Sequence, residues 1–136
     1  MIYVDTGPFI ARYITADQHY SSAIAGWATL ESLVESCATS NFVLDECITL
    51  LGRRAGHVFA AERAAAILSS RTFTILRADV KDEYKALQLF RKYADQHVSF
   101  TDCISCVLMR KHTIKRVFTF DIHFALAGFE IWKAEG

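Results

Sequence analysis

The sequence predicts an α/β protein with three layers, an α/β/α sandwich in which helices cover both faces of a mostly parallel central sheet. Short runs rich in β-branched and aromatic residues alternate along the chain with longer segments of helical periodicity. The first run is apolar up to Asp5, as expected of a strand that is buried on both faces. Strands separated by helices require right-handed crossover connections, which produce parallel pairs.

The chain begins with a strand, a short helix and a long helix. Residues 1–5 (MIYVD) form the strand, and Gly7 and Pro8 then open a helix that ends near residue 14. Residues 17–37 show the spacing of an amphipathic helix. Its predicted apolar face consists of His19, Tyr20, Ala23, Ile24, Trp27, Leu30, Leu33, Val34 and Cys37.

A second strand and two further helices are expected next. Residues 38–40 form the short strand, and apolar residues from Val43 restore the helical period up to Gly52 or Gly56. Glu46 lies near the start of that helix. The Ala-rich residues 57–70 predict another helix. Its apolar face is predicted at Val58, Ala61, Ala65 and Leu68.

The remaining elements repeat this alternation. Residues 71–76 (RTFTIL) have strand composition, and Asp79 caps a helix that runs to about residue 95. Tyr84, Leu87, Phe90 and Tyr93 recur on it at every third position. Ser99 and Thr101 are candidate caps of a helix that continues to His112. Strands are expected at residues 116–120 and 129–132.

Length and composition predict one globular domain over residues 1–136. The chain is 52% hydrophobic and 22% charged, and 15 basic side chains balance 15 acidic ones, so no overall charge attracts nucleic acid or a membrane. No uninterrupted apolar run has the roughly 18 residues of a membrane span, and no signal peptide is visible. Four scattered cysteines do not make a disulfide framework. We therefore expect a cytoplasmic, reduced protein with no membrane partner.

Four acidic residues stand where ligands of parallel sheets bind, beyond the carboxyl ends of the strands. Asp5 ends the first strand, Asp121 follows the strand at 116–120, Asp102 opens a helix, and Glu46 lies in the first turns of another. Asp45 points elsewhere, because neighbouring helical positions differ by about 100°. Acids at helix starts are often only caps, but an acid that ends a buried strand is harder to explain in that way.

Converging carboxylates repel one another unless a cation neutralises them. Mg²⁺ or Mn²⁺ prefers oxygen ligands, keeps several waters and binds phosphate together with a few carboxylates. The acids therefore predict a metal centre that suits the hydrolysis of phosphodiesters.

The segments that carry these acids resemble the PIN domain, especially its compact VapC-type toxins. The resemblance rests on MIYVDTGPFIA, the Glu of VLDECITLL, SFTDCIS and VFTFDIHF, in this order across almost the whole chain. It implies a Mg²⁺- or Mn²⁺-dependent endoribonuclease that cuts RNA. It also implies that the protein is the toxin of a toxin-antitoxin pair, with an antitoxin partner and a homodimeric state. The quartet that it implies maps onto Asp5, Glu46, Asp102 and Asp121.

The resemblance also suggests the roles of residues around the quartet. Asp5, Asp102 and Asp121 would hold one metal ion, and Glu46 would coordinate a second ion or orient the attacking water. Thr6 matches a hydroxyl residue expected to hydrogen-bond the acids, and Thr101 and Thr119 are candidates for similar supporting roles. Many relatives carry an acid where this chain has His123. Whether three or four carboxylates complete the site therefore stays open.

Other polar residues have weaker claims. Arg12, Arg53 and Arg54 each follow a segment that carries an acid and are candidates, together with His123, for binding substrate phosphate. Cys103 and Cys106 form a CxxC without a second pair at zinc spacing, so packing is the simpler interpretation. The cations at residues 110–116 surround a helix end, where they complement its dipole. His19 lacks a visible partner and is more readily a cap or a partly buried ring.

Two alternatives from other classes remain. The first is a PIN-like module that binds RNA or protein without cutting, although retention of all four acids argues against it. The second is a haloacid-dehalogenase-like phosphatase, but that class needs an Asp two residues after its first acid, and position 7 is Gly. Nucleotide-binding glycine motifs are absent from the sequence. The RNA target cannot be read from these motifs, because folded RNA is recognised by shape and unpaired bases.

Overall fold

The computed structural model, which describes residues 1–33 and 35–134, confirms a parallel sheet covered by helices. Five strands pair in the order β3-β2-β1-β4-β5, all parallel. The strands are β1 (Ile2–Val4), β2 (Cys37–Ser40), β3 (Phe73–Leu76), β4 (Arg116–Phe118) and β5 (Glu130–Ile131). The helices are α1 (Thr6–Ala11), α2 (Tyr20–Ser32), α3 (Asn41–Ala55), α4 (His57–Ser69), α5 (Val80–Lys92), α6 (Phe100–Lys111) and α7 (His123–Leu126).

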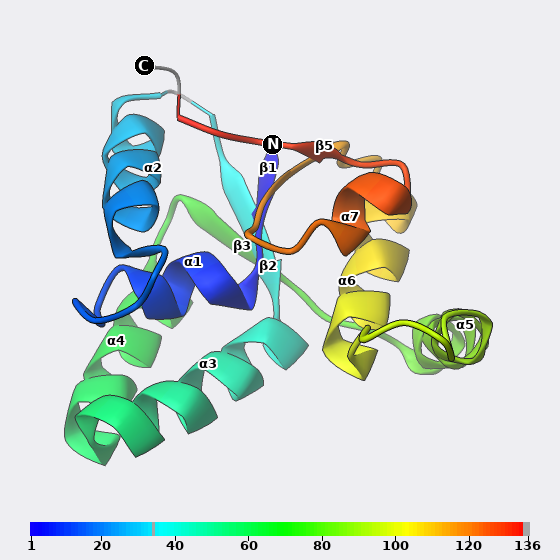
Figure 1. Cartoon of the computed structure of the whole chain (residues 1–136), viewed down its shortest axis with the longest axis horizontal. Helices are drawn as coiled ribbons and strands as arrows, with labels where there is room; N and C mark the ends of the chain where they lie inside the picture. The colour runs from blue at the N-terminus through cyan, green and yellow to red at the C-terminus, as the bar shows by residue number, and fades with distance from the viewer. Residues whose placement is uncertain (34, 135–136) are drawn as a thin grey trace.

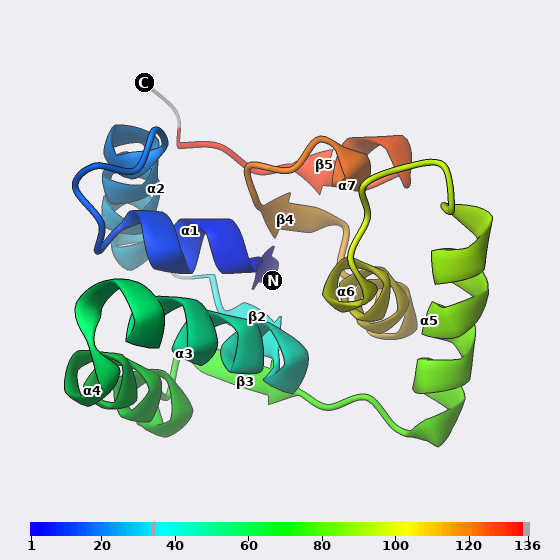
Figure 2. The same cartoon turned by 60° about the horizontal axis from the view of Figure 1, so that its bottom comes forward.

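The helices form two layers with the sheet between them. In Figure 1, α1, α2 and α4 lie on one side of the sheet, and α5, α6 and α7 lie on the other. Figure 2 shows the same division from another angle, with α6 between the sheet and α5. The strands run from the labelled N-terminus towards the first turns of α1 and α3, so the carboxyl ends of the strands share one edge. This arrangement is the predicted α/β/α sandwich.

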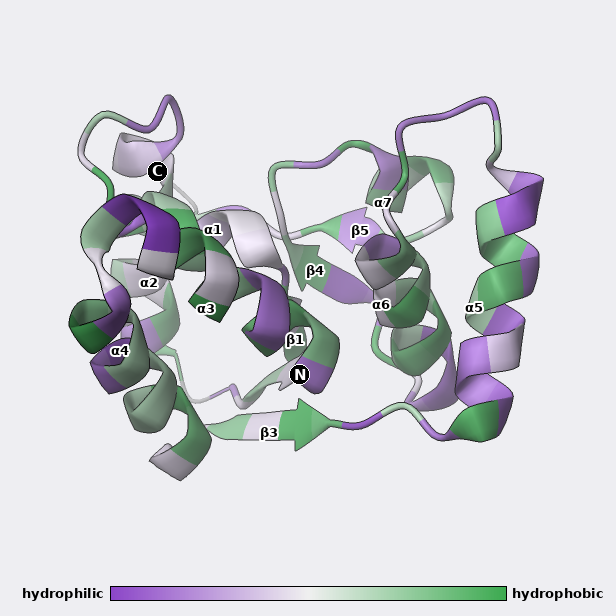
Figure 3. Ribbon diagram, turned by 90° about the horizontal axis from the view of Figure 1, so that it is seen from below, coloured by the Kyte–Doolittle hydropathy of each residue, from purple (hydrophilic) through white to green (hydrophobic). Residues whose placement is uncertain are grey.

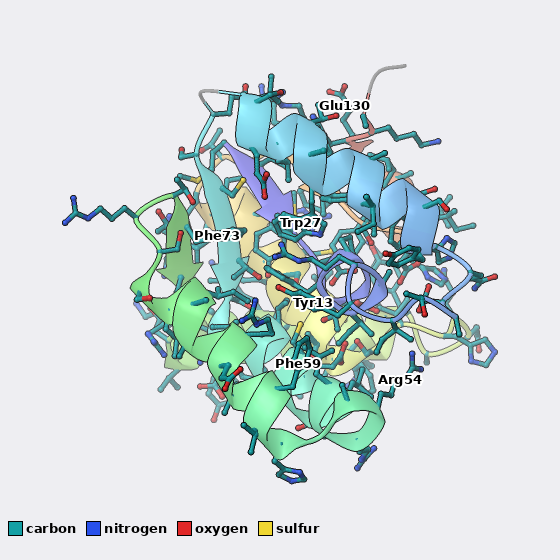
Figure 4. All side chains as sticks on the ribbon, turned by 90° about the vertical axis from the view of Figure 1, so that its left-hand side faces the viewer. Tyr13, Trp27, Arg54, Phe59, Phe73 and Glu130 are labelled. Atoms are coloured by element: carbon teal, nitrogen blue, oxygen red, sulfur yellow. The ribbon has the colours of Figure 1, made fainter. Side chains whose placement is uncertain are left out.

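The central strand and the aromatic residues of α1 and α2 build the core. All three residues of β1 are fully buried, as expected for a strand covered on both faces. Trp27 packs on Phe9 with ring centroids 5.2 Å apart, and its indole N–H donates to the carbonyl of Pro8 at 2.9 Å. Figure 4 labels Trp27 and Phe73, whose ring centroids are 6.0 Å apart. It also labels Tyr13 and Phe59, which pack edge to face between α1 and α4.

Gly26 allows α2 to approach β4 closely. A Cβ atom at this position would stand 2.3 Å from the ring of Phe118, a distance that real Cβ atoms essentially never show. Phe118 is the last residue of β4 and therefore fixes where the chain beyond that strand begins. The glycine thus sets the spacing between this helix and the strand that leads to Thr119 and Asp121.

The helix predicted at residues 17–37 is shorter than expected. It begins at Tyr20 and ends at Ser32, and Cys37 is the first residue of β2, paired with Ile2 and Phe73. Pairing with strands on both sides satisfies the backbone of this segment and outweighs the apparent helical period. Of the predicted apolar face, Ile24 and Leu33 are exposed and Val34 lies outside the described residues.

The apolar faces of α4 and α5 were also predicted incorrectly. On α4 the buried residues are Ala60 and Ala64, whereas the predicted face (Val58, Ala61, Ala65 and Leu68) is exposed. In an Ala-rich helix the periodicity is ambiguous, and small alanines are the residues that allow close packing on α3. On α5, Ala86 is buried, while three of the four predicted residues (Tyr84, Leu87 and Phe90) are exposed.

Smaller differences concern the ends of elements. The short helix α7 was not predicted, and it begins two residues after Asp121 in the segment between β4 and β5. The first helix ends at Ala11 rather than near residue 14. Within residues 1–33 and 35–134, no helix combines the length and the apolar character needed to cross a bilayer.

Candidate active site

The four acids lie around the point where the strand order reverses. From β1 the chain builds β2 and β3 on one side of the sheet and then returns to build β4 and β5 on the other. In open parallel sheets, ligands bind beyond the carboxyl ends of the strands at such a switch point. Asp5 directly follows β1, and Thr119 and Asp121 follow β4, which pairs with β1. Figure 3 looks onto this edge, with α3 and α6 on either side of β1.

Asp5 is a buried carboxylate that forms no ion pair with a cation among the described residues. Its side chain is 6% exposed, and its Oδ2 accepts a hydrogen bond from the Thr119 hydroxyl at 2.8 Å. Although Asp5 occupies the N-cap position of α1, its side chain makes no capping hydrogen bond, so capping does not explain it. Burial raises its pKa to about 7, and the nearby charge of Asp102 acts in the same direction.

Thr119 links two of the acids. Its hydroxyl donates to Asp5 and accepts the backbone N–H of Asp121 at 3.0 Å. The Oδ1 atom of Asp121 in turn accepts the backbone N–H of His123 at 2.9 Å and lies 2.6 Å from the Nδ1 of its ring. The segment after β4 is therefore tied to the end of β1 through side chains.

Asp102 lies in the first turn of α6, where it closes a capping box with Ser99. The Ser99 hydroxyl accepts the backbone N–H of Asp102 at 3.1 Å, and Asp102 Oδ2 accepts the backbone N–H of Ser99 at 3.0 Å. Burial raises the pKa of Asp102, and the charges of Asp121 and Glu46 add to the effect. The Ser-x-x-Asp pattern is typical of such a box, but only the cap at Ser99 was predicted from the sequence, not its reciprocal bond with Asp102.

Glu46 lies in the second turn of α3, a helix that Ser40 positions. The buried Ser40 hydroxyl accepts the backbone N–H of Val43 at 3.1 Å and so caps the helix where β2 ends. This cap was not identified from the sequence. Glu46 is half-buried and its charge contributes to the raised pKa of both Asp5 and Asp102, whereas Asp45 is exposed. The four acids are thus electrostatic neighbours.

The two other threonines do not make the expected contacts. The Thr6 hydroxyl is buried and has no hydrogen-bond partner among the described residues, so Thr119 is the one of the three expected threonines that bonds an acid there. Thr101 is half-buried in the first turn of α6, and no hydrogen bond of its side chain occurs among the described residues.

The candidate arginines lie at varying distances from the quartet. Arg53 and Arg54 are in the last turn of α3, which places them about 10–12 Å along the helix from Glu46. Arg54 lies 3.8 Å from an Asp17 oxygen and projects at the edge of the molecule in Figure 4. The Arg12 guanidinium lies 4.4 Å from the centroid of the Trp27 ring, a cation–π contact. Their binding of phosphate stays a prediction.

The remaining polar candidates have structural partners. Cys103 and Cys106 are buried free thiols, and burial raises the pKa of Cys103 to about 11 and that of Cys106 to about 12, which makes them inert. His19 stacks on Phe120 with ring centroids 4.3 Å apart. Two of the cations near the end of α6 are paired, Lys111 with Asp79 and Asp82, and Arg116 with Glu35.

Comparison with known proteins identifies the family. The model of the PIN domain matches residues 2–130. A curated relative, the 23S rRNA-specific endonuclease VapC20 of Mycobacterium tuberculosis (strain H37Rv), is 36% identical over 129 residues, which make up 95% of each chain. The match therefore spans all four segments that carry the acids.

Solved structures agree with this assignment. The crystal structure of Mycobacterium tuberculosis VapC20, described as a sarcin-ricin loop cleaving toxin, superposes with a TM-score of 0.84 and 35% identity over 95% of this chain and 96% of that one. The VapBC2 complex of Rickettsia felis, bound to promoter DNA, gives a TM-score of 0.70 at 15% identity over 99% and 100% of the two chains, which supports the fold alone. The chain therefore belongs to the PIN-domain family and, within it, to the VapC-type endoribonuclease toxins.

Proposed function

We propose that this chain cuts RNA with the help of a divalent cation, Mg²⁺ or Mn²⁺, held by Asp5, Asp102 and Asp121. The observation that carries the proposal is the buried carboxylate of Asp5, whose pKa is raised to about 7 by burial and by the charge of Asp102. A protein that keeps mutually repelling acids in a partly buried place needs a cation to neutralise them. Perturbed acids of this kind are typical of functional sites.

The residues fit a hard divalent ion. All four acids offer oxygen donors, and the buried Thr6 hydroxyl beside Asp5 has no hydrogen-bond partner among the described residues. No lysine or arginine forms an ion pair with Asp5, Glu46 or Asp102 within the part of the chain that the structure describes. In that part of the chain no three acids, histidines or cysteines stand together as a ready-made metal site. An ion that takes few protein ligands and keeps several of its waters does not need such a preformed group.

The surrounding residues hold the carboxylates in place. Thr119 fixes one oxygen of Asp5 and the backbone of Asp121, and His123 fixes the Asp121 side chain. The capping box leaves one carboxylate oxygen of Asp102, Oδ1, free of a hydrogen bond in the described structure. A bound ion would supply a water of lowered pKa and offset the charge that develops on the phosphate. Glu46, on the opposing helix, would orient that water or hold a second ion.

The RNA substrate and the partners are proposed by comparison with VapC20, which matches 95% of this chain. We propose that the RNA target is 23S rRNA, at the sarcin-ricin loop that VapC20 cleaves, because the two proteins share 36% identity over 95% of both chains. As a VapC-type toxin the protein would work in the cytoplasm, form a homodimer and be held inactive by a cognate antitoxin.

The test is cleavage of ribosomal RNA by the purified protein with Mg²⁺, with Mn²⁺ and with a chelator. We expect discrete fragments that require the metal, and a melting temperature that rises on addition of Mn²⁺ because the ion relieves repulsion between the acids. Cleavage that persists in the chelator would disprove metal dependence. Intact RNA under every condition, with undiminished RNA binding, would favour the module that binds without cutting.

A matched pair of variants on α3 tests Glu46. Glu46→Gln removes a charge that acts on both Asp5 and Asp102, and we expect cleavage to fall about a hundredfold, the usual contribution of a general base. Asp45→Asn makes the same change at the exposed neighbouring position and should cut like the wild type. If the two variants cleaved RNA at equal rates, Glu46 would have no role in catalysis.

A further inference from the structure

A small hollow opens beside the acids, between the loop before α6 and the helix α7. Its volume is about 190 Å³, and Asp102 and His123 form part of its wall. The rest of the wall includes Tyr93, Val98, Phe124 and Leu126, with Gln96 on the loop. Pockets for complete small ligands usually measure about 300–1,000 Å³, so this one suits a single flat ring.

The chemistry of the hollow is that of a base-binding site. Tyr93 supplies an aromatic surface, and the Gln96 amide offers two donors and an acceptor for the edge of a base. Proteins recognise unpaired RNA bases by stacking them on aromatic side chains and hydrogen-bonding their edges. An RNA strand whose phosphate lies at Asp102 would place the adjacent base against the wall of this hollow.

Exposed apolar residues on and before α7 support the same interpretation. Leu126 borders the hollow and is 72% exposed, and Ile122, which immediately precedes α7, is exposed to the same extent. The described part of the chain does not cover these apolar side chains, although they lie near a group of carboxylates. Flat apolar surface there suits a base or ribose face, which an acidic rim alone would not attract.

We propose that this hollow, here called the base pocket, binds one unpaired nucleobase adjacent to the scissile phosphate, with Tyr93 stacking on the base and Gln96 reading its edge. The proposal rests on the proposed ribonuclease function and adds a specificity-determining site to it. Recognition would then require a base that is flipped out of its stack, as in enzymes that extrude nucleotides from folded nucleic acid.

The test combines changes in the protein with changes in the RNA. Tyr93→Leu keeps an apolar side chain that packs against the core but removes the aromatic face, and Gln96→Ala changes only the exposed loop. Gln88→Ala, on the exposed surface of α5, is the matched control. The substrates are a stem-loop RNA that the wild type cuts and a set in which each nucleotide around the cut is replaced in turn by an abasic one.

For the wild type we expect one abasic position to lower kcat/KM about tenfold to a hundredfold, the range for loss of one stacked base. On intact RNA, Tyr93→Leu should show the same reduction of kcat/KM as the wild type shows on the abasic RNA. On that abasic RNA, Tyr93→Leu and the wild type should have equal kcat/KM. Gln96→Ala should weaken the preference for the base at that position alone. The proposal would be overturned if the effects of Tyr93→Leu and of the abasic position on kcat/KM multiplied. It would also be overturned if the variants cut intact and abasic RNA at the wild-type rates.

A binding measurement separates this inference from the function on which it rests. RNA carrying 2-aminopurine at the sensitive position, or at each loop position if nothing is cut, is titrated with protein in chelator. We expect the fluorescence to be quenched by the wild type and by Gln88→Ala but not by Tyr93→Leu. If the wild type cuts no RNA, the proposed function fails, and this quenching alone decides whether the base pocket binds a base. If Tyr93→Leu quenches normally but escapes inhibition by the antitoxin, the pocket receives the antitoxin and the proposal is wrong.

Discussion

Two helices of this protein begin with the same local structure, and only one of them faces the active site. At the start of α5, Asp79 accepts the backbone N–H of Asp82, and Asp82 accepts that of Asp79. At the start of α6, Ser99 and Asp102 exchange the same two hydrogen bonds. Both third-position aspartates therefore satisfy the helix end in the same manner.

The difference lies in the surrounding charge. Lys111 Nζ lies 2.9 Å from Asp82 and 3.4 Å from Asp79, and the pKa of Asp79 is lowered by the hydrogen bond from Asp82 and by Lys111. Asp102 has no such cation among the described residues, and its pKa is raised by burial and by two other acids. Both carboxylates cap a helix, but only Asp82 also has a cation that neutralises it. The unneutralised charge of Asp102 is what we expect of a ligand-binding carboxylate.

Replacing each of these aspartates by asparagine tests this difference most directly. Either amide can still accept the backbone N–H, so both capping boxes should persist. We expect Asp102→Asn to reduce RNA cleavage about a thousandfold, since a tenfold loss of rate corresponds to about 1.4 kcal/mol and a metal ligand contributes several. Asp82→Asn should cut at the wild-type rate. A cleavage assay on the same RNA measures both, and an active Asp102→Asn would refute the assignment of the site.

The two regions should also respond to pH with opposite signs when metal is absent. The raised pKa of Asp5 means that the folded protein binds a proton more tightly than the unfolded chain, so stability falls as pH rises from about 4 to about 7. Asp102 acts in the same direction. The lowered pKa of Asp79 has the opposite effect, because its contribution is present above its ordinary pKa and is lost on acidification.

Urea unfolding in chelator at several pH values measures this effect. Asp5→Asn should flatten the decline between pH 4 and 7 and gain up to about 4 kcal/mol at pH 7, since three pKa units correspond to about that free energy. The exposed Asp45→Asn serves as the control and should follow the wild type. Parallel curves for Asp5→Asn and the wild type would show that Asp5 is not held in an unfavourable charged state.

The stabilities of the asparagine variants sharpen the comparison at pH 7. Asp82→Asn replaces a charge-assisted hydrogen bond to Lys111 by a neutral one, so we expect the free energy of unfolding to fall by about 1–2 kcal/mol. Asp102→Asn should leave it unchanged or raise it, because the change relieves repulsion from Asp121 and Glu46. Chemical denaturation in chelator gives both values. A loss of equal size in the two variants would mean that Asp102 is an ordinary cap.

The sequence predicted that the acids gather at one edge of the sheet, because strand ends and acids are both local signals. The apolar run before Asp5 and the strand before Asp121 indicated two strands of a parallel sheet, but only the structure shows that these strands are neighbours. Asp102 was identified from its segment, but its capping box with Ser99 was overlooked. Local patterns thus located the acids without showing what holds them.

Features that depend on long-range packing were missed. Cys37 fits a helical period, but pairing with strands on both sides places it in β2. Which face of α4 is buried depends on its packing against α3, and the periodicity of the α4 sequence carries no information about that contact. Of the hydroxyls expected to support the acids, Thr119 bonds Asp5, 114 residues away in sequence, because β4 pairs with β1, whereas Thr6 directly beside Asp5 makes no hydrogen bond in the described structure. Sequence periodicity reports burial within one element and does not report which elements meet.

The caps themselves provide the smallest and last test of the comparison. Ser99→Ala removes the acceptor for the Asp102 backbone N–H, which should lower the free energy of unfolding by about 1 kcal/mol. It should also lower kcat about tenfold, because a looser first turn misplaces the Asp102 carboxylate. Asp79→Ala removes the corresponding acceptor on α5 and should lower the melting temperature without changing kcat. Ser99→Thr, which retains the hydroxyl, should restore kcat. If Ser99→Ala loses stability but keeps full activity, the capping box stabilises α6 without positioning Asp102, and the two helix ends differ only in the charges that surround them.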